Sequence, residues 1–239
     1  MNDEERFPLI TFLIATIYLA VFLFTYKNIS SYQNQFGFVP AKIEVLDLFT
    51  YSFIHADLFH LITNLALLVV IGLALEDAIG KFYFSFIYFA SSMTAILFDI
   101  LGRFILNISF NASFIGGSGA IFGLLAIAVL FKPTEKIPIF FLLVAFLPFI
   151  QLIFESGILS NQLVLMWVLL LSTIAILFVF LKAFQLPLHI VLVIYLLSWL
   201  ISLALKYPLS VSFIGHLGGV VGGILGFILI AEKKKQTFY

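Results

Sequence analysis

The stretch GGSGAIFG, residues 116 to 123, places four glycines and one serine in a chain otherwise dominated by Leu, Ile, Phe and Val. Glycine lowers helix propensity, but small residues four apart let two membrane helices approach closely. Gly119 and Gly123 have this spacing. The stretch therefore predicts the start of a transmembrane helix that packs tightly against a neighbour. Ser118, among these glycines, is either a small packing residue or a chemical group.

The composition around this stretch is that of a membrane protein. The 239-residue chain is 63% hydrophobic and 10% charged, whereas charged residues make up about a quarter of a soluble domain. Its formal net charge is zero, so no nucleic-acid partner is indicated. The absence of cysteine excludes disulfides, thiolate metal sites and cysteine catalysis. We expect the lipid bilayer as a partner, no metal and no organic cofactor; the sequence predicts no oligomeric state.

Charges, prolines and polar clusters divide the chain into apolar runs of membrane-spanning length. We expect one all-α membrane domain over residues 1–239, with residues 27–56 as a partly structured loop at the outer interface. The acidic start MNDEERFPLI is unlike the basic region of a cleaved signal peptide, so we expect the first span to be retained. Eight spans are predicted: residues 8–26, 57–75, 82–102, 116–132, 138–154, 162–181, 188–206 and 212–231.

Basic residues predict the orientation, because they gather on the cytoplasmic side of a membrane. Placing the N-terminus inside puts eight of them at inner ends and four at outer ends. We therefore expect both termini in the cytoplasm, in a multi-pass protein of the cell membrane. The inner residues are Arg6, Lys81, Lys132, Lys136, Lys182, Lys233, Lys234 and Lys235; the outer ones are Lys27, Lys42, Arg103 and Lys206.

Strongly polar side chains inside a membrane are costly, and they are candidates for function. His60 and Asn64 are four residues apart, so they share one face of the second span. The stretch GHLGGVVGGILG, residues 215 to 226, sets His216 at the top of two ridges of glycines four residues apart. The fourth span, with Gly119 and Gly123, is a candidate partner for this glycine face. Each group alone is also compatible with simple packing between helices.

Their joint position favours chemistry, because Ser118, His216, His60 and Asn64 all map to outer ends of spans. A serine needs a base to become a strong nucleophile, and histidine is the usual base. The backbone N–H groups at the helix start by Gly117, the Asn64 amide and the His60 ring are candidate donors to an oxyanion. Phe122 is expected to stack on the His216 ring. No acidic residue is positioned as a third member, which favours a Ser–His dyad.

Four separated motifs in this order resemble those of the rhomboid intramembrane serine proteases. The resemblance implies Ser118 as nucleophile, His216 as general base, and His60 with Asn64 as oxyanion donors. It also implies that the protein cleaves other membrane proteins within or beside a transmembrane segment. The motifs are HADLFHLITN at 55–64, GLALEDAIG at 72–80, GGSGAIFGLL at 116–125 and GHLGGVVGG at 215–223.

The chain also departs from the family pattern. The first outer loop lacks the Trp-Arg pair of some bacterial members. The family core has six helices, with one between the serine and histidine helices, whereas Ser118 and His216 are 98 residues apart here. Both motifs sit at outer ends of inward-running helices, so an odd number of spans must separate them. Three fit the length, and we expect an inserted pair of helices within residues 133–211.

Three alternatives compete with a serine protease. A non-catalytic rhomboid-like scaffold that binds transmembrane segments typically lacks the serine or the histidine, and this chain has both. A transporter would have a site near the bilayer midplane and repeated topology, whereas these polar residues gather near one face and no repeat is visible. A metalloprotease using His55, His60 and His216 would lack the HExxH motif.

Overall fold

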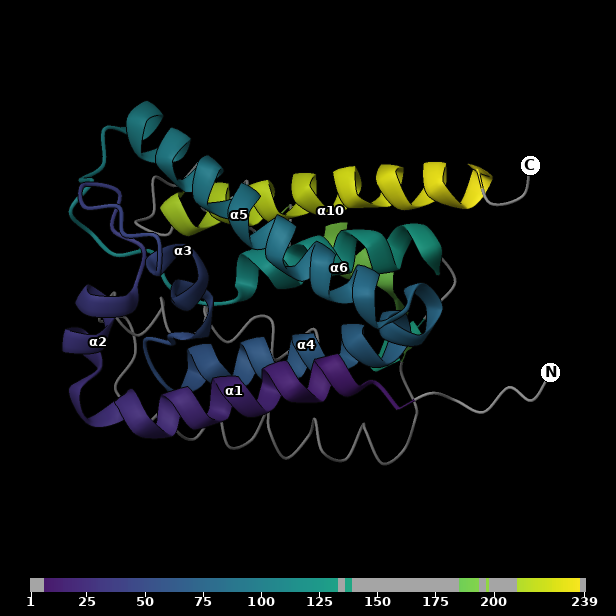
Figure 1. Ribbon diagram of the computed structural model, residues 1–239, viewed down its shortest axis with the longest axis horizontal. Helices are drawn as coiled ribbons and strands as arrows, with labels where there is room; N and C mark the ends of the chain where they lie inside the picture. The colour runs from purple at the N-terminus through teal and green to yellow at the C-terminus, as the bar shows by residue number, and fades with distance from the viewer. Residues whose placement is uncertain (1–6, 133–135, 139–184, 194–196, 198–209, 237–239) are drawn as a thin grey trace.

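The structure is a computed structural model that describes residues 7–132, 136–138, 185–193, 197 and 210–236. Its described part is a helical bundle in which α1 (Leu9–Thr25), α4 (Leu58–Ile79), α5 (Lys81–Leu106), α6 (Ser118–Phe131) and α10 (Ser210–Gln236) run side by side. α1 begins and α10 ends at the same end of the bundle (Figure 1). The start of α6 lies toward the opposite end, together with the starts of α4 and α10.

Four of the described helical segments are long and apolar enough to cross a membrane. They are Leu9–Phe36, Leu58–Ile79, Lys81–Leu106 and Ile214–Ala231, with mean hydropathies of 2.2, 2.4, 1.7 and 2.0. α6 is apolar but has only 14 residues. These elements match the expected spans at 8–26, 57–75, 82–102, 116–132 and 212–231. The expected spans at 138–154 and 162–181, and most of that at 188–206, lie outside the described residues, so eight spans stay a prediction.

Short elements interrupt the segment between α1 and α4, which was expected to be a partly structured loop. They are the 3₁₀ turn η1 (Tyr26–Asn28), α2 (Ile29–Phe36), α3 (Asp47–Thr50) and the 3₁₀ turn η2 (Tyr51–Phe53). The described part is helical as expected, apart from two three-residue strands, β1 (Lys136–Pro138) and β2 (Gln185–Pro187), which pair antiparallel with Lys136 opposite Pro187. All other regular elements in the described part of the chain are helices.

Local sequence explains where the long helices begin and end. Asp57 caps α4, since its carboxylate accepts the His60 backbone N–H at 2.8 Å. Gly80, with φ of 85°, is the single residue between α4 and α5; a positive φ is accessible to glycine without a Cβ clash. α5 ends at Leu106, and its C-cap Asn107 takes the left-handed conformation with φ of 52°. These three residues fix the positions of the central helices along the chain.

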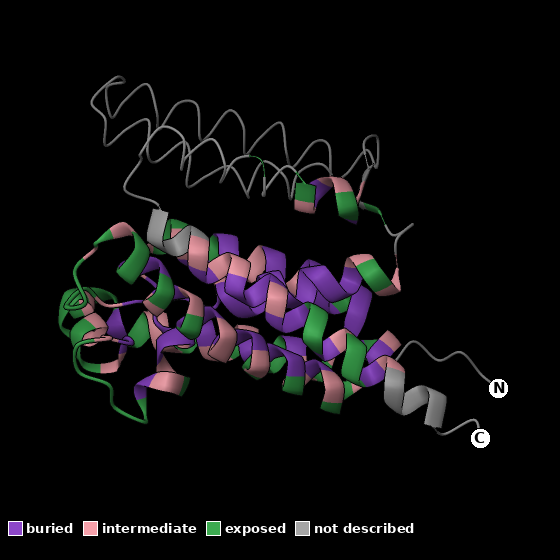
Figure 2. Ribbon diagram, turned by 90° about the horizontal axis from the view of Figure 1, so that it is seen from above, coloured by how far each residue is buried: buried purple, intermediate pink, exposed green. Residues whose placement is uncertain are grey.

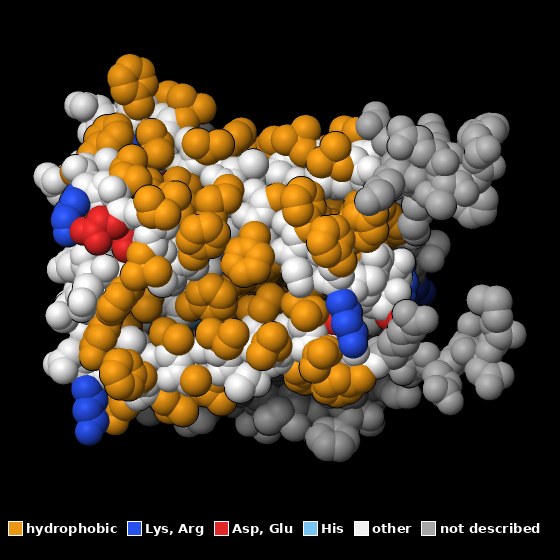
Figure 3. Space-filling model, viewed as in Figure 1, with side chains coloured by type: hydrophobic (Ala, Val, Ile, Leu, Met, Phe, Trp, Pro, Cys, Tyr) orange, Lys and Arg blue, Asp and Glu red, His pale blue; other side chains and the backbone are white. Residues whose placement is uncertain are grey.

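The core lies between the five helices of the bundle, and α6 is buried on all sides from Gly119 to Ala128 (Figure 2). Its largest fully buried side chains include Tyr18, Tyr88, Phe84, Leu68 and Ile121. Large apolar side chains also cover the outside, and the charged side chains seen in Figure 3 lie toward the two ends. An apolar exterior between charged ends is suited to hydrocarbon surroundings.

The two glycine ridges of α10 contact two different helices. An added Cβ at Gly219 would meet the backbone of Gly119 on α6, and one at Gly223 would meet the backbone of Gly123. On the other ridge, a Cβ at Gly222 would meet Thr94 and Ser91 of α5. The expected contact between the histidine helix and the serine helix is therefore present, and it runs backbone to backbone.

Candidate active site

The chain enters α6 through Gly116, at a position where any residue with a side chain would be strained. Gly116 has φ of 101°, and its N–H donates to the Tyr51 carbonyl at 2.9 Å. A Cβ added to Gly116 would lie 2.6 Å from Cε1 and Nε2 of His60. The His60 ring therefore packs on the backbone just before Gly117, which is the N-cap of α6, and Ser118, which is its first residue.

Ser118 and His216 meet between α6 and α10 although 98 residues separate them. The Ser118 Oγ lies 2.6 Å from the His216 Nε2, which is hydrogen-bond distance. The Phe122 ring lies against the His216 ring, with centroids 4.7 Å apart and an interplanar angle of 38°. Both the serine and the histidine are half-buried. The bare Gly119–Gly219 contact brings the two helices close enough for this pairing.

His60 and Asn64 lie one turn apart on α4, as their spacing predicts. The Asn64 Nδ2 donates to the His60 carbonyl at 2.7 Å, and the Ala56 backbone N–H donates to the His60 Nδ1 at 3.3 Å. A ring nitrogen that accepts carries no proton, so in a neutral His60 the proton is on Nε2. That N–H is on the side of the ring that faces Gly116. This tautomer gives His60 a donor beside the serine motif.

A pair of buried tyrosines supports the site from behind, and the sequence reasoning missed it. The Tyr18 hydroxyl of α1 and the Tyr88 hydroxyl of α5 are 2.6 Å apart. A Cβ at Gly117 would collide with the Tyr18 hydroxyl, so this pair lies directly against the N-cap of α6. A signal was available: Thr11, Tyr18 and Thr25 are spaced seven apart in the first apolar run, and the structure buries all three. A polar stripe with that period marks the inward face of a helix.

The loop that leads into Ser118, residues 107–117, is hydrogen-bonded to the segment between α1 and α4. Phe38 and Phe114 exchange both backbone hydrogen bonds, at 3.0 and 2.7 Å, and the Ala41 N–H donates to the Phe110 carbonyl at 3.0 Å. The Phe114 ring stacks on Tyr51 at 5.3 Å. A Cβ at Gly215 would lie 2.7 Å from the Phe114 ring, so Phe114 also touches the residue before His216.

A buried ion pair holds the other end of this loop. The Arg103 Nε donates to the Asp99 carboxylate at 2.7 Å, and the Arg103 Nη1 donates to the Ser109 carbonyl at 2.6 Å. Asp99 and Arg103 are 0% and 2% exposed on α5. Since buried charges at membrane depth need partners, this pair fixes the loop firmly on α5.

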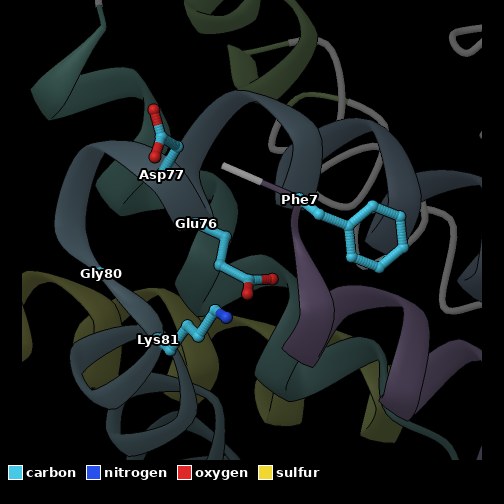
Figure 4. A pocket seen from close by; sticks show the side chains of 5 residues that line it. All are labelled: Phe7, Glu76, Asp77, Gly80 and Lys81. Carbon is cyan, nitrogen blue, oxygen red and sulfur yellow. The ribbon is translucent and has the colours of Figure 1, made fainter. Parts of the chain in front are cut away.

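Glu76, near the end of α4, joins this helix to the beginning of α1, at the opposite end of the bundle from Ser118. Its carboxylate accepts from the Ile10 N–H at 2.9 Å, the Thr11 N–H at 2.8 Å and the Thr11 hydroxyl at 2.7 Å. In Figure 4 the Glu76 side chain extends toward the beginning of α1 by Phe7, while Asp77 points away. Glu76 thus caps α1 from a different helix, and its negative charge suits a helix N-terminus.

His55 lies beside His60 outside the helical span and contacts Tyr18 as well. Ring centroids are 5.1 Å apart for the two histidines and 4.6 Å apart for His55 and Tyr18. Burial, and then the neighbouring His60, lower the pKa of His55 to about 3. Within the described ranges, no group of three His, Asp or Glu side chains is arranged to hold a metal ion.

The helices and the site define a multi-pass membrane protein with a serine and a histidine paired between two closely packed helices. Comparison with known families places the chain more narrowly, since residues 42–167 match the rhomboid domain. The chain belongs to the rhomboid family. The matched range includes His60, Asn64 and Ser118, and it ends before His216.

Three curated relatives from Arabidopsis thaliana are similar to parts of the chain. Rhomboid-like protein 11, chloroplastic, is 34% identical over 118 residues, 48% of this chain and 38% of that protein. Inactive RHOMBOID-like protein 8 is 37% identical over 84 residues, 35% of this chain and 24% of that protein. RHOMBOID-like protein 1 is 37% identical over 89 residues, 36% of this chain and 21% of that protein. The chain thus matches well under half of each relative's length, and no solved structure matches it.

Proposed function

We propose that this protein is an intramembrane serine endopeptidase that cleaves transmembrane segments of other membrane proteins with a Ser118–His216 dyad. The observation that carries the proposal is the 2.6 Å separation of the Ser118 Oγ and the His216 Nε2. At that distance the imidazole nitrogen can take the hydroxyl proton as the oxygen attacks a peptide carbonyl. Contact with Phe122 restricts how far the His216 ring can turn.

The steps after attack need the same few groups. The tetrahedral intermediate carries a negative oxygen, and preorganised donors must stabilise it. The Nε2–H of His60, the Asn64 amide and the backbone N–H groups at the Gly117–Ser118 helix start supply such donors. The protonated His216 then gives its proton to the leaving amine, and a water attacks the acyl-serine in the reverse sequence. No metal or organic cofactor enters these steps.

The length of α6 supports cleavage at membrane depth. Its 14 residues span about 21 Å, less than the ~30 Å of hydrocarbon. Lys132 follows the other end of the helix, where a lysine suits the interface. A helix anchored there would hold Ser118 below the opposite surface. A substrate helix must unwind to present a peptide bond to Ser118.

The proposal includes the topology expected from the charge pattern. Both termini are cytoplasmic, the site opens toward the outer face of the cell membrane, and residues 1–239 form one domain. The six-helix family core is extended by two further spans between α6 and α10. Cysteine-accessibility labelling of single-cysteine variants at Lys42 and Lys81 tests the orientation, since the first should react from outside and the second only after permeabilisation.

The second candidate function is a non-catalytic scaffold that binds transmembrane segments. The observation in its favour is the similarity to Inactive RHOMBOID-like protein 8. The two functions differ in one result, because a scaffold binds a segment without cutting it.

A cleavage assay separates the two functions. The wild-type protein, purified in detergent, is incubated with a panel of single-pass transmembrane proteins, and fragments are measured by mass spectrometry. We expect cleavage by the wild type and by Ser85→Ala, a matched control on α5, and none by Ser118→Ala or His216→Ala. Asn64→Ala should cut about 10²-fold more slowly if it is one oxyanion donor. Cleavage by Ser118→Ala at the wild-type rate would refute the dyad.

A further inference from the structure

An apolar groove with a volume of about 450 Å³ lies beside α1, away from every residue of the proposed dyad. α1, α2 and the turn η2 form its walls. Its main lining side chains are Ile17, Ala20, Phe24, Tyr32, Phe36 and Phe53. Tyr32 holds the aromatic wall together, since its ring packs 5.7 Å from that of Phe24 and 6.2 Å from that of Phe36.

The two threonine hydroxyls in the groove wall are already satisfied by the protein. The Thr25 Oγ1 donates to the Val21 carbonyl at 2.9 Å, and the Thr50 Oγ1 donates to the Phe36 carbonyl at 2.8 Å. The groove therefore presents hydrocarbon and aromatic surface to whatever fills it. Water needs several polar partners to occupy a cavity, so it is a poor occupant here.

The groove opens on the side of the bundle that carries the apolar exterior of α1. Leu23 and Phe24 are 61% and 74% exposed there, and the apolar side chains in Figure 3 extend over this helix. In a bilayer this surface is in contact with acyl chains. An empty apolar space loses dispersion contacts on all its walls, so the neighbouring hydrocarbon is drawn into it.

A positive charge lies two residues along the chain from the groove residue Thr25, and it suits a phospholipid headgroup. Lys27 follows Thr25 by two residues, and no Asp or Glu occurs between residues 7 and 43. Lys27 has no carboxylate partner within the described ranges, whereas Lys42 pairs with Glu44. A lysine at the membrane surface attracts the anionic phosphates of lipids. Along the chain, the apolar groove residues are thus followed by a cation without a carboxylate partner, just as the acyl chain of a lipid is followed by its phosphate headgroup.

We propose that this groove binds one acyl chain of a bilayer phospholipid, with the lipid phosphate against Lys27. The bound chain fills the space between α1 and η2 and braces the segment that leads to His55. It therefore stabilises the outer half of the bundle, and it does so whether or not the protein is a protease.

Photocrosslinking tests this site on the full chain. The protein is reconstituted into phosphatidylethanolamine vesicles containing phosphatidylglycerol with a diazirine midway along one acyl chain. After irradiation, labelled peptides are identified by mass spectrometry. We expect strong labelling of peptides covering residues 17–25 and 50–54. Ala20→Trp, which fills the groove, should lower that labelling several-fold, while Leu19→Trp on the opposite side of α1 should leave it unchanged.

Lys27→Gln provides a second arm at an exposed residue. It should lower labelling from phosphatidylglycerol at low salt. Labelling of the groove peptides no stronger than that of the exposed face at Leu19, or equal labelling of Ala20→Trp and Leu19→Trp, would overturn the proposal. A groove filled by a second copy of the chain or by a substrate helix would give this weak labelling of the groove peptides.

Discussion

The bare contact between Gly219 and Gly119 sets the distance between the serine and the histidine, and Gly219→Ala tests that dependence. The added Cβ would collide with the Gly119 carbonyl oxygen and would lie 2.7 Å from the carbonyl carbon and 3.1 Å from the Cα of that residue. Carbon atoms at rest are about 3.5–4.0 Å apart. Because all three obstructing atoms are backbone, α10 must move away from α6 by about 1 Å.

That displacement is large compared with the tolerance of proton transfer. Adding about 1 Å to the 2.6 Å separation of the Ser118 Oγ and the His216 Nε2 carries it beyond the ~3.2 Å limit of a hydrogen bond. Misplacement of this size typically costs about 10²-fold in rate. We therefore expect Gly219→Ala to cleave transmembrane substrates about 10²-fold more slowly. Overpacking should lower its free energy of unfolding by about 1–3 kcal/mol.

Gly226→Ala is the matched control on the same helix. Its added Cβ would lie 3.0 Å from the Ile87 Cγ1, a side-chain atom that can shift. Cleavage rates under substrate saturation and thermal unfolding in detergent should be measured for both variants. If folded Gly219→Ala cleaves as fast as Gly226→Ala, the helix contact does not control the dyad and the reasoning fails.

Three further predictions concern the parts that hold the bundle together. Glu76→Gln keeps only one acceptor oxygen for the three donors at the start of α1, so it should lower the free energy of unfolding by about 2–4 kcal/mol. Asp77→Asn, at the exposed neighbouring residue, should not lower it. Equal melting temperatures of the two variants would exclude the cap. Arg103→Ala leaves the Asp99 carboxylate buried without its partner, so it should lower the free energy of unfolding by about 3–5 kcal/mol, measured by denaturant unfolding. Arg103→Lys should retain part of the stability. An unchanged unfolding midpoint in Arg103→Ala would contradict the role of the ion pair. Burial lowers the pKa of His55 from 6.5 to about 3, so between these pH values only the unfolded chain takes up the proton, and the free energy of unfolding should fall by about 1.4 kcal/mol per pH unit below 6.5. His55→Phe should therefore flatten the pH dependence of the melting temperature. An equal slope in that variant would assign the effect to other groups.

The sequence was most informative where hydropathy and helical spacing act locally. Five expected spans correspond to α1, α4, α5, α6 and α10, and the four-residue glycine spacing identified the contact between α6 and α10. The approach of Phe122 to His216 was also confirmed. These features depend on the period of the helix and on residue size, both of which are visible in one segment at a time.

Contacts between distant segments were not predictable in the same way. The pairing of Phe38 with Phe114 uses backbone groups, which every residue has, so the side chains carry no sign of it. The cap of α1 by Glu76 depends on how two antiparallel helices are aligned. The Tyr18–Tyr88 pair joins two spans whose inward faces had not been assigned, although the polar stripe on α1 indicated one of them. The expected spans between residues 138 and 206 stay predictions.

Covalent labelling by a fluorophosphonate, read out by peptide mass spectrometry, tests the central claim without a known substrate. Such a reagent modifies a serine only when a neighbouring base has activated its hydroxyl. The account predicts a single adduct on Ser118 in the wild type and in Ser85→Ala, and its loss in folded His216→Ala. An unlabelled Ser118 in the folded wild type, or equal labelling of Ser118 in His216→Ala, would contradict the dyad.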